Sequence, residues 1–137
     1  MKYLISTKAK KSSSKSDNTV LDESYQIFFK KYEIELYPID NYRDEIDIKN
    51  CKYLRDLSKF DGVIISGSGD IMIDQKDIPL GKHSKYSPNR DFTENYLIGK
   101  FIENTKKIIG ICHGMQKINQ YFGGRMDPYF HCKKATY

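Results

Sequence analysis

The apolar positions of this chain change their period several times, and each change indicates the end of one element and the start of the next. Lys2–Ser6 carries Tyr, Leu and Ile and predicts a first strand. Glu33–Ile39 alternates acidic and apolar residues and contains Pro38, which favours a strand near a sheet edge because proline cannot donate to a central ladder. Gly62–Ser66 and Lys107–Ile111 are short apolar runs beside glycine, typical of buried strands in a parallel sheet.

Helical periods separate these strands, as an alternating α/β fold requires. The first helix has an aromatic stripe that we assign to the core, and Thr19 with Asp22 offers a start that resembles a capping box. A short helix precedes Gly62, and a longer one opens at Asn89 or Arg90 and ends near Asn104-Thr105. The apolar positions that carry these periods are Leu21, Tyr25, Phe28, Phe29 and Tyr32, then Tyr53, Leu54, Leu57 and Phe60, then Leu97, Ile98, Phe101 and Ile102.

Three polar stretches lack any period. Thr7–Asp17 is rich in lysine and serine and is expected to be a mobile loop, whose lysines either meet an anionic substrate or form a solvated surface. Asn41–Asn50 is acidic and irregular. Ile71–Pro88 reads as a long loop on the substrate side that could act as a lid. Together the elements predict a three-layer α/β fold with a mostly parallel sheet.

Composition bounds the class of protein. A chain of 137 residues with 39% hydrophobic content supports one domain over residues 1–137 with a modest core. No apolar run approaches the ~20 residues of a membrane span, and the amino-terminal apolar stretch is too short for a signal peptide, so we expect a cytoplasmic protein without a membrane partner. The net charge of +5 comes from lysines interleaved with acids, which indicates a solvated surface rather than a nucleic-acid site.

Cysteine usage also fits a cytoplasmic protein with reduced thiols. The three cysteines, Cys51, Cys112 and Cys132, are odd in number and lack a C-x-x-C spacing. Neither a disulfide framework nor a zinc site is therefore indicated, and we expect no bound metal and no cofactor.

Cys112 is the candidate nucleophile. It stands where the period switches from strand to helix, between Gly110 and Gly114, and glycines at these positions remove the side chains that would collide in a sharp turn. The unpaired N–H groups of a helix's first turn favour an anion, so a thiol placed there is a reactive one. The alternative is that Cys112 is a small buried hydrophobe, as most free cysteines are.

A second glycine turn follows the strand Gly62–Ser66. Gly67 and Ser68, with Gly69 and Asp70 after them, allow backbone N–H groups to approach a ligand and stabilise a developing oxyanion. Such turns are common in α/β proteins. This one indicates an oxyanion site mainly because it comes one β-unit before Cys112 in the chain.

These motifs resemble those of class I glutamine amidotransferase-like proteins, closest to the branch that hydrolyses γ-glutamyl amides, the peptidase C26-like branch. The resemblance covers about Phe60 to Gly124 well and the first sixty residues only weakly. It implies a flavodoxin-like sheet. It rests on Gly110–Gln116 with Asn119 and Gly123-Gly124, on Asp61–Gly67, and on Arg90-Asp91 with Glu94.

The resemblance also implies roles for particular residues. Cys112 would attack the γ-carbonyl of glutamine or a γ-glutamyl amide and form a glutamyl thioester. The oxyanion would be held by backbone N–H groups of Gly67, Ser68 and His113, and the substrate by Gln116 and Asp70. His113 stands where that branch usually has arginine, and its backbone matters more to the mechanism than its ring.

The catalytic base is the part that the sequence does not supply. In the family it is a histidine with an acidic partner well downstream of the cysteine. His131 instead follows directly after the motif and is better explained by a surface or packing role. His83 lies in the long loop with nothing to fix it. We therefore expect an incomplete domain that is weakly active or inactive and prone to self-association. The alternatives are a non-catalytic α/β binding remnant and a glutaminase subunit that delivers ammonia to a synthetase partner.

Overall fold

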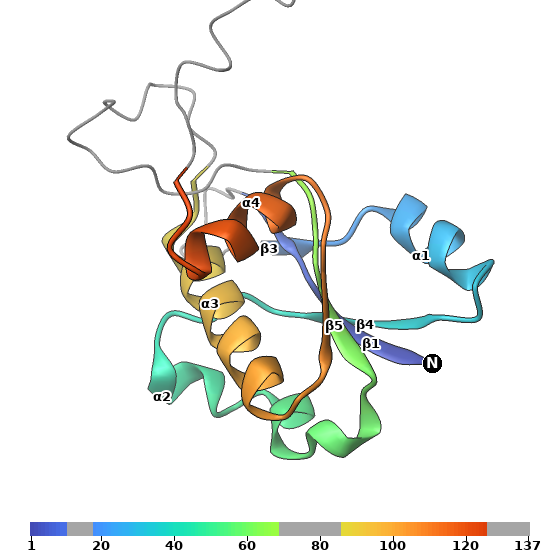
Figure 1. Cartoon of the computed structure of the whole chain (residues 1–137), viewed down its shortest axis with the longest axis horizontal. Helices are drawn as coiled ribbons and strands as arrows, with labels where there is room; N and C mark the ends of the chain where they lie inside the picture. Colours follow the sequence, from blue (N-terminus) through green and yellow to red (C-terminus); the bar gives the residue numbers. More distant parts are fainter. Residues whose placement is uncertain (11–17, 69–85, 126–137) are drawn as a thin grey trace, which may run out of the picture.

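A parallel sheet of four strands organises the chain (Figure 1). The computed structural model describes residues 1–10, 18–68 and 86–125. The strand order is β4-β1-β5-β6, and every pairing is parallel. This confirms the expected α/β class, and it places Pro38 on an edge strand as predicted. The strands are β1 (Lys2–Ser6), β4 (Glu35–Ile39), β5 (Gly62–Ile65) and β6 (Lys107–Gly110).

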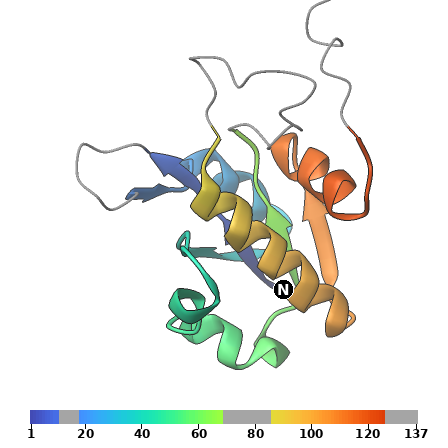
Figure 2. The ribbon, with the colours of Figure 1, turned by 90° about the vertical axis from the view of Figure 1, so that its left-hand side faces the viewer.

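Helices cover both faces of this sheet and make three layers (Figures 1 and 2). Helix α1 (Glu23–Lys30) packs on one face through Phe29, against Ile5 and Ile64. The other face is covered by α3 (Pro88–Glu103), which Figure 2 shows crossing in front of the strands. Because β1 and β5 lie between the two layers, their apolar side chains are buried, with at most 3% exposed, which is why these strands are continuous apolar runs.

The aromatic stripe of α1 is only partly in the core, which corrects the sequence prediction. Phe29 is 6% exposed, but Phe28 and Tyr32 are more than half exposed and contact each other at a ring separation of 5.3 Å. The start of the helix also differs: Asp22 is the N-cap and accepts a hydrogen bond from Ser24 N at 2.8 Å, while Thr19 belongs to a preceding strand. A single sheet face can bury only one side of an eight-residue helix, so the wider stripe exceeds what the core accepts.

The first polar stretch is partly ordered. Lys8–Lys10 forms a strand, β2, that pairs antiparallel with β3 (Asn18–Val20), so the expectation of a loop from Thr7 is wrong for these residues. Backbone pairing needs no apolar pattern, and the sequence therefore carried no signal for it. Residues 11–17 of that loop lie outside the described part of the chain.

The connection between β4 and β5 is also more regular than predicted. The acidic stretch contains a short helix, α2 (Glu45–Ile48), with Asp44 as its N-cap and Ile48 buried. The expected short helix before Gly62 is two 3₁₀ turns, Lys52–Arg55 and Leu57–Lys59. Residues 71–85, most of the expected long loop, lie outside the described part of the chain, whereas Pro88, its predicted last residue, begins α3.

Helix α4 (His113–Tyr121) follows β6 directly, as the change of period predicts. Its buried residues, however, are His113, Gly114 and Lys117, whereas Met115 is 60% and Phe122 is 68% exposed. Of Met115, Ile118 and Phe122, the apolar positions that predict this helix, Ile118 alone packs against the core, so their spacing indicated the helix but only part of its packed face. No helix in the described ranges is long and apolar enough to cross a bilayer.

Candidate active site

A strained turn holds Cys112 between β6 and α4. Its backbone has φ 51° and ψ −105°, a region that side chains other than glycine rarely occupy and that costs of order 1–3 kcal/mol. The two flanking glycines are required by contact distances. A Cβ on Gly110 would lie 2.7 Å from the backbone of Gly114, and a Cβ on Gly114 would lie 1.8 Å from the carbonyl oxygen of Ile65. Cys112 itself is exposed, whereas Cys51 is buried, so its side chain is open to a substrate.

The glycine turn after β5 lies beside this cysteine. The ladder between β5 and β6 pairs Ile65 with Gly110 and continues with a hydrogen bond of 3.0 Å from Ile111 N to Ile65 O. A Cβ placed on Gly67 would lie 3.5 Å from Cys112 Cβ. The register of two parallel strands therefore brings Gly67, one of the predicted oxyanion residues, next to the predicted nucleophile.

Arg90 holds the carbonyl groups of this turn. Its Nη2 donates to Ser66 O at 2.9 Å and to Gly67 O at 3.1 Å, and its Nη1 donates to Ser68 O. In a trans peptide the N–H of the next residue points opposite to the carbonyl. By binding the carbonyls on one side, Arg90 turns the N–H groups of Gly67 and Ser68 away from itself.

Glu94 joins this arginine to the nucleophile turn. Its carboxylate is fully buried, and Oε1 lies 2.8 Å from both Arg90 Nε and His113 Nε2. Its other oxygen accepts a hydrogen bond from Ser6 Oγ at 3.3 Å. One carboxylate on α3 thus contacts groups from the end of β1, from the arginine that orients the glycine turn, and from the residue after Cys112. The His113 ring is engaged structurally, which leaves its backbone N–H as the part able to face a substrate.

Comparison with known proteins identifies the family. The family model of peptidase C26 matches residues 8–135, which is nearly the whole chain. The chain belongs to the peptidase C26 family. A curated relative is "Putative glutamine amidotransferase-like protein YvdE" of Lactococcus lactis subsp. lactis, which is 34% identical over 71 residues. That alignment covers 51% of this chain and 30% of the relative, so the chain matches under a third of the relative's length.

In this peptidase C26 protein a second polar contact fixes α4 against α3. Lys117 is 2% exposed, and its Nζ hydrogen-bonds to Asp91 Oδ1 and, at 3.3 Å, to Gln120 Oε1. A buried ammonium needs such partners because an isolated charge is costly to remove from water. The start of α4, and with it the Cys112 turn, is held against α3 by Lys117 as well as by His113.

The predicted substrate residues are placed less completely. Gln116 lies one turn into α4, half-buried, and its N–H donates to Cys112 O at 3.1 Å. Asp70, His83 and His131 lie outside the described residues, so their predicted roles stay predictions. Arg90 and Glu94 could be singled out from the sequence only through the family resemblance. An arginine and a glutamate four residues apart on one helix are nevertheless spaced for an ion pair.

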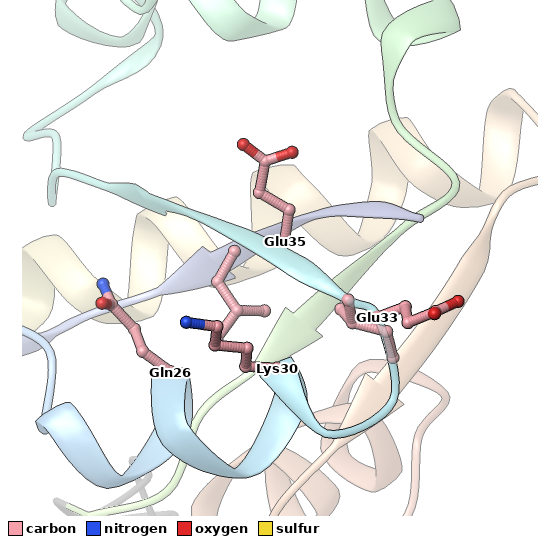
Figure 3. A pocket seen from close by; sticks show the side chains of 6 residues that line it. Gln26, Lys30, Glu33 and Glu35 are labelled. Carbon is pink, nitrogen blue, oxygen red and sulfur yellow. The ribbon is translucent and has the colours of Figure 1, made fainter.

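A shallow hollow of about 340 Å³ lies elsewhere, between α1 and β4 (Figure 3). Its charged lining consists of Lys30, Glu33 and Glu35, and it includes no residue of the Cys112 turn or the glycine turn. This hollow is therefore separate from the candidate site at Cys112.

Proposed function

We propose that this chain carries the nucleophile and oxyanion half of a glutamine amidotransferase-like cysteine hydrolase that acts on γ-glutamyl amides. One observation supports this most: the strained, exposed Cys112 sits beside a glycine turn whose peptide groups are oriented by a buried arginine. That arrangement costs conformational free energy, and strain of this kind concentrates at functional sites. The proposed location is the cytoplasm, where thiols remain reduced.

The reaction that fits is acyl transfer to the thiol. Cys112 Sγ bonds to the γ-carbonyl carbon, the carbonyl oxygen becomes an oxyanion, and the C–N bond then breaks as the nitrogen receives the proton that the thiol gave up. Water hydrolyses the resulting thioester, releasing glutamate and returning a proton to the sulfur. Donors aimed at the oxyanion are worth several kcal/mol in such a step.

The proton transfers need a base that is not placed among the described residues. His113 is the one histidine there, and its ring is buried and bound to Glu94. We therefore expect the chain to react well with substrates whose leaving group needs no proton and poorly with glutamine itself.

The test is acylation of purified protein by a γ-glutamyl thiophenyl ester, whose thiolate leaves unprotonated. Intact-mass measurement should show one glutamyl adduct, peptide mapping should place it on Cys112, and hydroxylamine should remove it as a thioester. Cys51→Ala should acylate normally and Cys112→Ala should not. A wild-type protein that stays unmodified under conditions in which iodoacetamide alkylates Cys112 would refute the proposed function and favour the non-catalytic binding protein.

A further inference from the structure

Tyr25 contacts the glycine turn from α1, the helix on the face of the sheet opposite α3. It lies on α1, and its hydroxyl accepts a hydrogen bond of 2.7 Å from Gly67 N. Gly67 N–H is the group that the family resemblance offers to the oxyanion, so in this structure that donor is already engaged. A short hydrogen bond of this kind leaves the N–H little capacity for a second acceptor.

The phenol is also close to the nucleophile. A Cβ built on Gly67 would lie 3.0 Å from Tyr25 Oη and 3.5 Å from Cys112 Cβ, so the hydroxyl and the cysteine flank the same small space. The ring is half-buried and packs against the cluster that contains Phe29 and Ile64. Packing against this cluster therefore fixes the position of the Tyr25 ring.

A hydroxyl can accept and donate at once. Tyr25 Oη accepts from Gly67 N, and among the described residues no hydrogen bond donated by this hydroxyl is present. A donor that itself accepts a hydrogen bond is polarised and donates more strongly. The Gly67 N–H would thus strengthen the phenol as a hydrogen-bond donor instead of donating to the oxyanion itself.

We propose that the Tyr25 hydroxyl donates a hydrogen bond to the oxyanion formed at Cys112, with Gly67 N–H supporting it and His113 N–H as the second donor. This rests on the proposed function. Tyr25 only donates a hydrogen bond: its O–H bond stays intact, and no covalent bond to the phenol oxygen forms or breaks. The contrary arrangement, in which the oxyanion takes Gly67 N–H, requires the substrate to displace an anchored ring from its 2.7 Å hydrogen bond.

The experiment compares Tyr25→Phe with Tyr32→Phe. Tyr32 follows the same helix and is 59% exposed, so Tyr32→Phe controls for loss of a phenol hydroxyl from this layer. Two rate constants are measured for each protein, one for acylation of Cys112 by the γ-glutamyl thiophenyl ester and one for its alkylation by iodoacetamide, which forms no oxyanion. We expect Tyr25→Phe to lower the acylation rate constant by about 100-fold, as loss of one oxyanion donor does, and to leave alkylation unchanged. Tyr32→Phe should match wild type in both.

Each other outcome overturns the proposal in a recognisable way. Faster acylation by Tyr25→Phe would show that the phenol blocks Gly67 N–H, and an unchanged rate would show that it has no role. Failure of the wild-type protein to acylate would refute the proposed function as well. If the wild-type protein acylates, the proposed function stands and the Tyr25→Phe rate tests the role of Tyr25 alone. If Tyr25→Phe does not give the wild-type circular dichroism spectrum, 4-aminophenylalanine at position 25 replaces it; this side chain keeps a donor and should retain most of the acylation rate.

Discussion

Glu94→Gln should strongly destabilise the protein although it changes only an oxygen into an NH₂ group. The substitution keeps the shape of the side chain and removes its charge at a fully buried position. Arg90, whose side chain is 4% exposed, would then keep its hydrogen bonds to the glycine turn but lose its counter-charge. A buried charge without a partner is one of the few single changes that cost several kcal/mol.

The magnitude follows from the burial of the pair. Breaking a buried ion pair by removing one partner costs about 3–5 kcal/mol, and we expect about 3 kcal/mol here because the Arg90 guanidinium retains three backbone carbonyl partners. A domain of this size has a free energy of unfolding of about 5–15 kcal/mol. The variant would therefore lose a large fraction of the total.

Urea unfolding followed by circular dichroism measures this loss. With a slope of about 2 kcal/mol per molar, a loss of about 3 kcal/mol lowers the midpoint by about 1.5 M. Glu103→Gln is the matched control: it lies on the same helix, and its ion pair with Lys100 at 3.6 Å is exposed, with side-chain exposures of 42% and 67%. Such surface pairs contribute about 0.2–1 kcal/mol, so its midpoint should barely move.

Equal midpoints for Glu94→Gln and Glu103→Gln would refute the reasoning. That result would mean that the charge of Glu94 contributes no net stability to the folded protein. Arg90 would in that case derive its stability from the carbonyl groups alone.

Three further predictions follow from local geometry. Gly114→Ala should cost about 3 kcal/mol or more in urea unfolding, since its Cβ would lie 1.8 Å from a backbone oxygen, whereas Gly99→Ala, whose Cβ meets only a tyrosine hydroxyl at 3.1 Å, should stay within about 1 kcal/mol of wild type. Limiting iodoacetamide, read by peptide mass mapping, should label Cys112 well before the buried Cys51, and equal labelling would contradict the strand-to-helix turn. Hydrogen bonds from the Ser58 hydroxyl, and next from the Ser58 N–H, lower the pKa of Asp56 in the folded protein. The stability that Asp56 contributes is therefore present above its unfolded-state pKa and is lost as the pH falls through its folded-state pKa. Asp56→Asn should flatten the acid part of the curve of unfolding free energy against pH, and an unaltered curve would rule out this contribution.

The strands and the cysteine turn could be predicted because their signals are local. β1 has its predicted bounds, and β5 and β6 end one residue short of theirs, since an apolar run between turn residues has few other uses. Cys112 was found for the same reason: two glycines and a change of period within five residues describe a tight turn. The described structure places that turn where it was expected.

The packed faces and the buried polar contacts could not be predicted in this way. The buried face of α4 includes Gly114 and Lys117, one because a backbone oxygen passes close by and the other because Asp91 neutralises it, and neither cause is visible in a hydrophobic pattern. Glu94 contacts Ser6, 88 positions away, and His113, 19 positions away. Tyr25 likewise meets Gly67 only because α1 and β5 come together in three dimensions.

The arrangement of α3 has a consequence for how the protein moves. Arg90, Asp91 and Glu94 lie within one and a half turns of this helix, and between them they hold the glycine turn, α4 and the cysteine turn. Both halves of the site are thus attached to one helix. Fluctuations that lift the start of α3 from the sheet would release both halves in a single event. The amide hydrogens of the two turns should then exchange with solvent at a common rate, as one cooperative unit whose opening free energy is that of α3 and lies below that of the sheet.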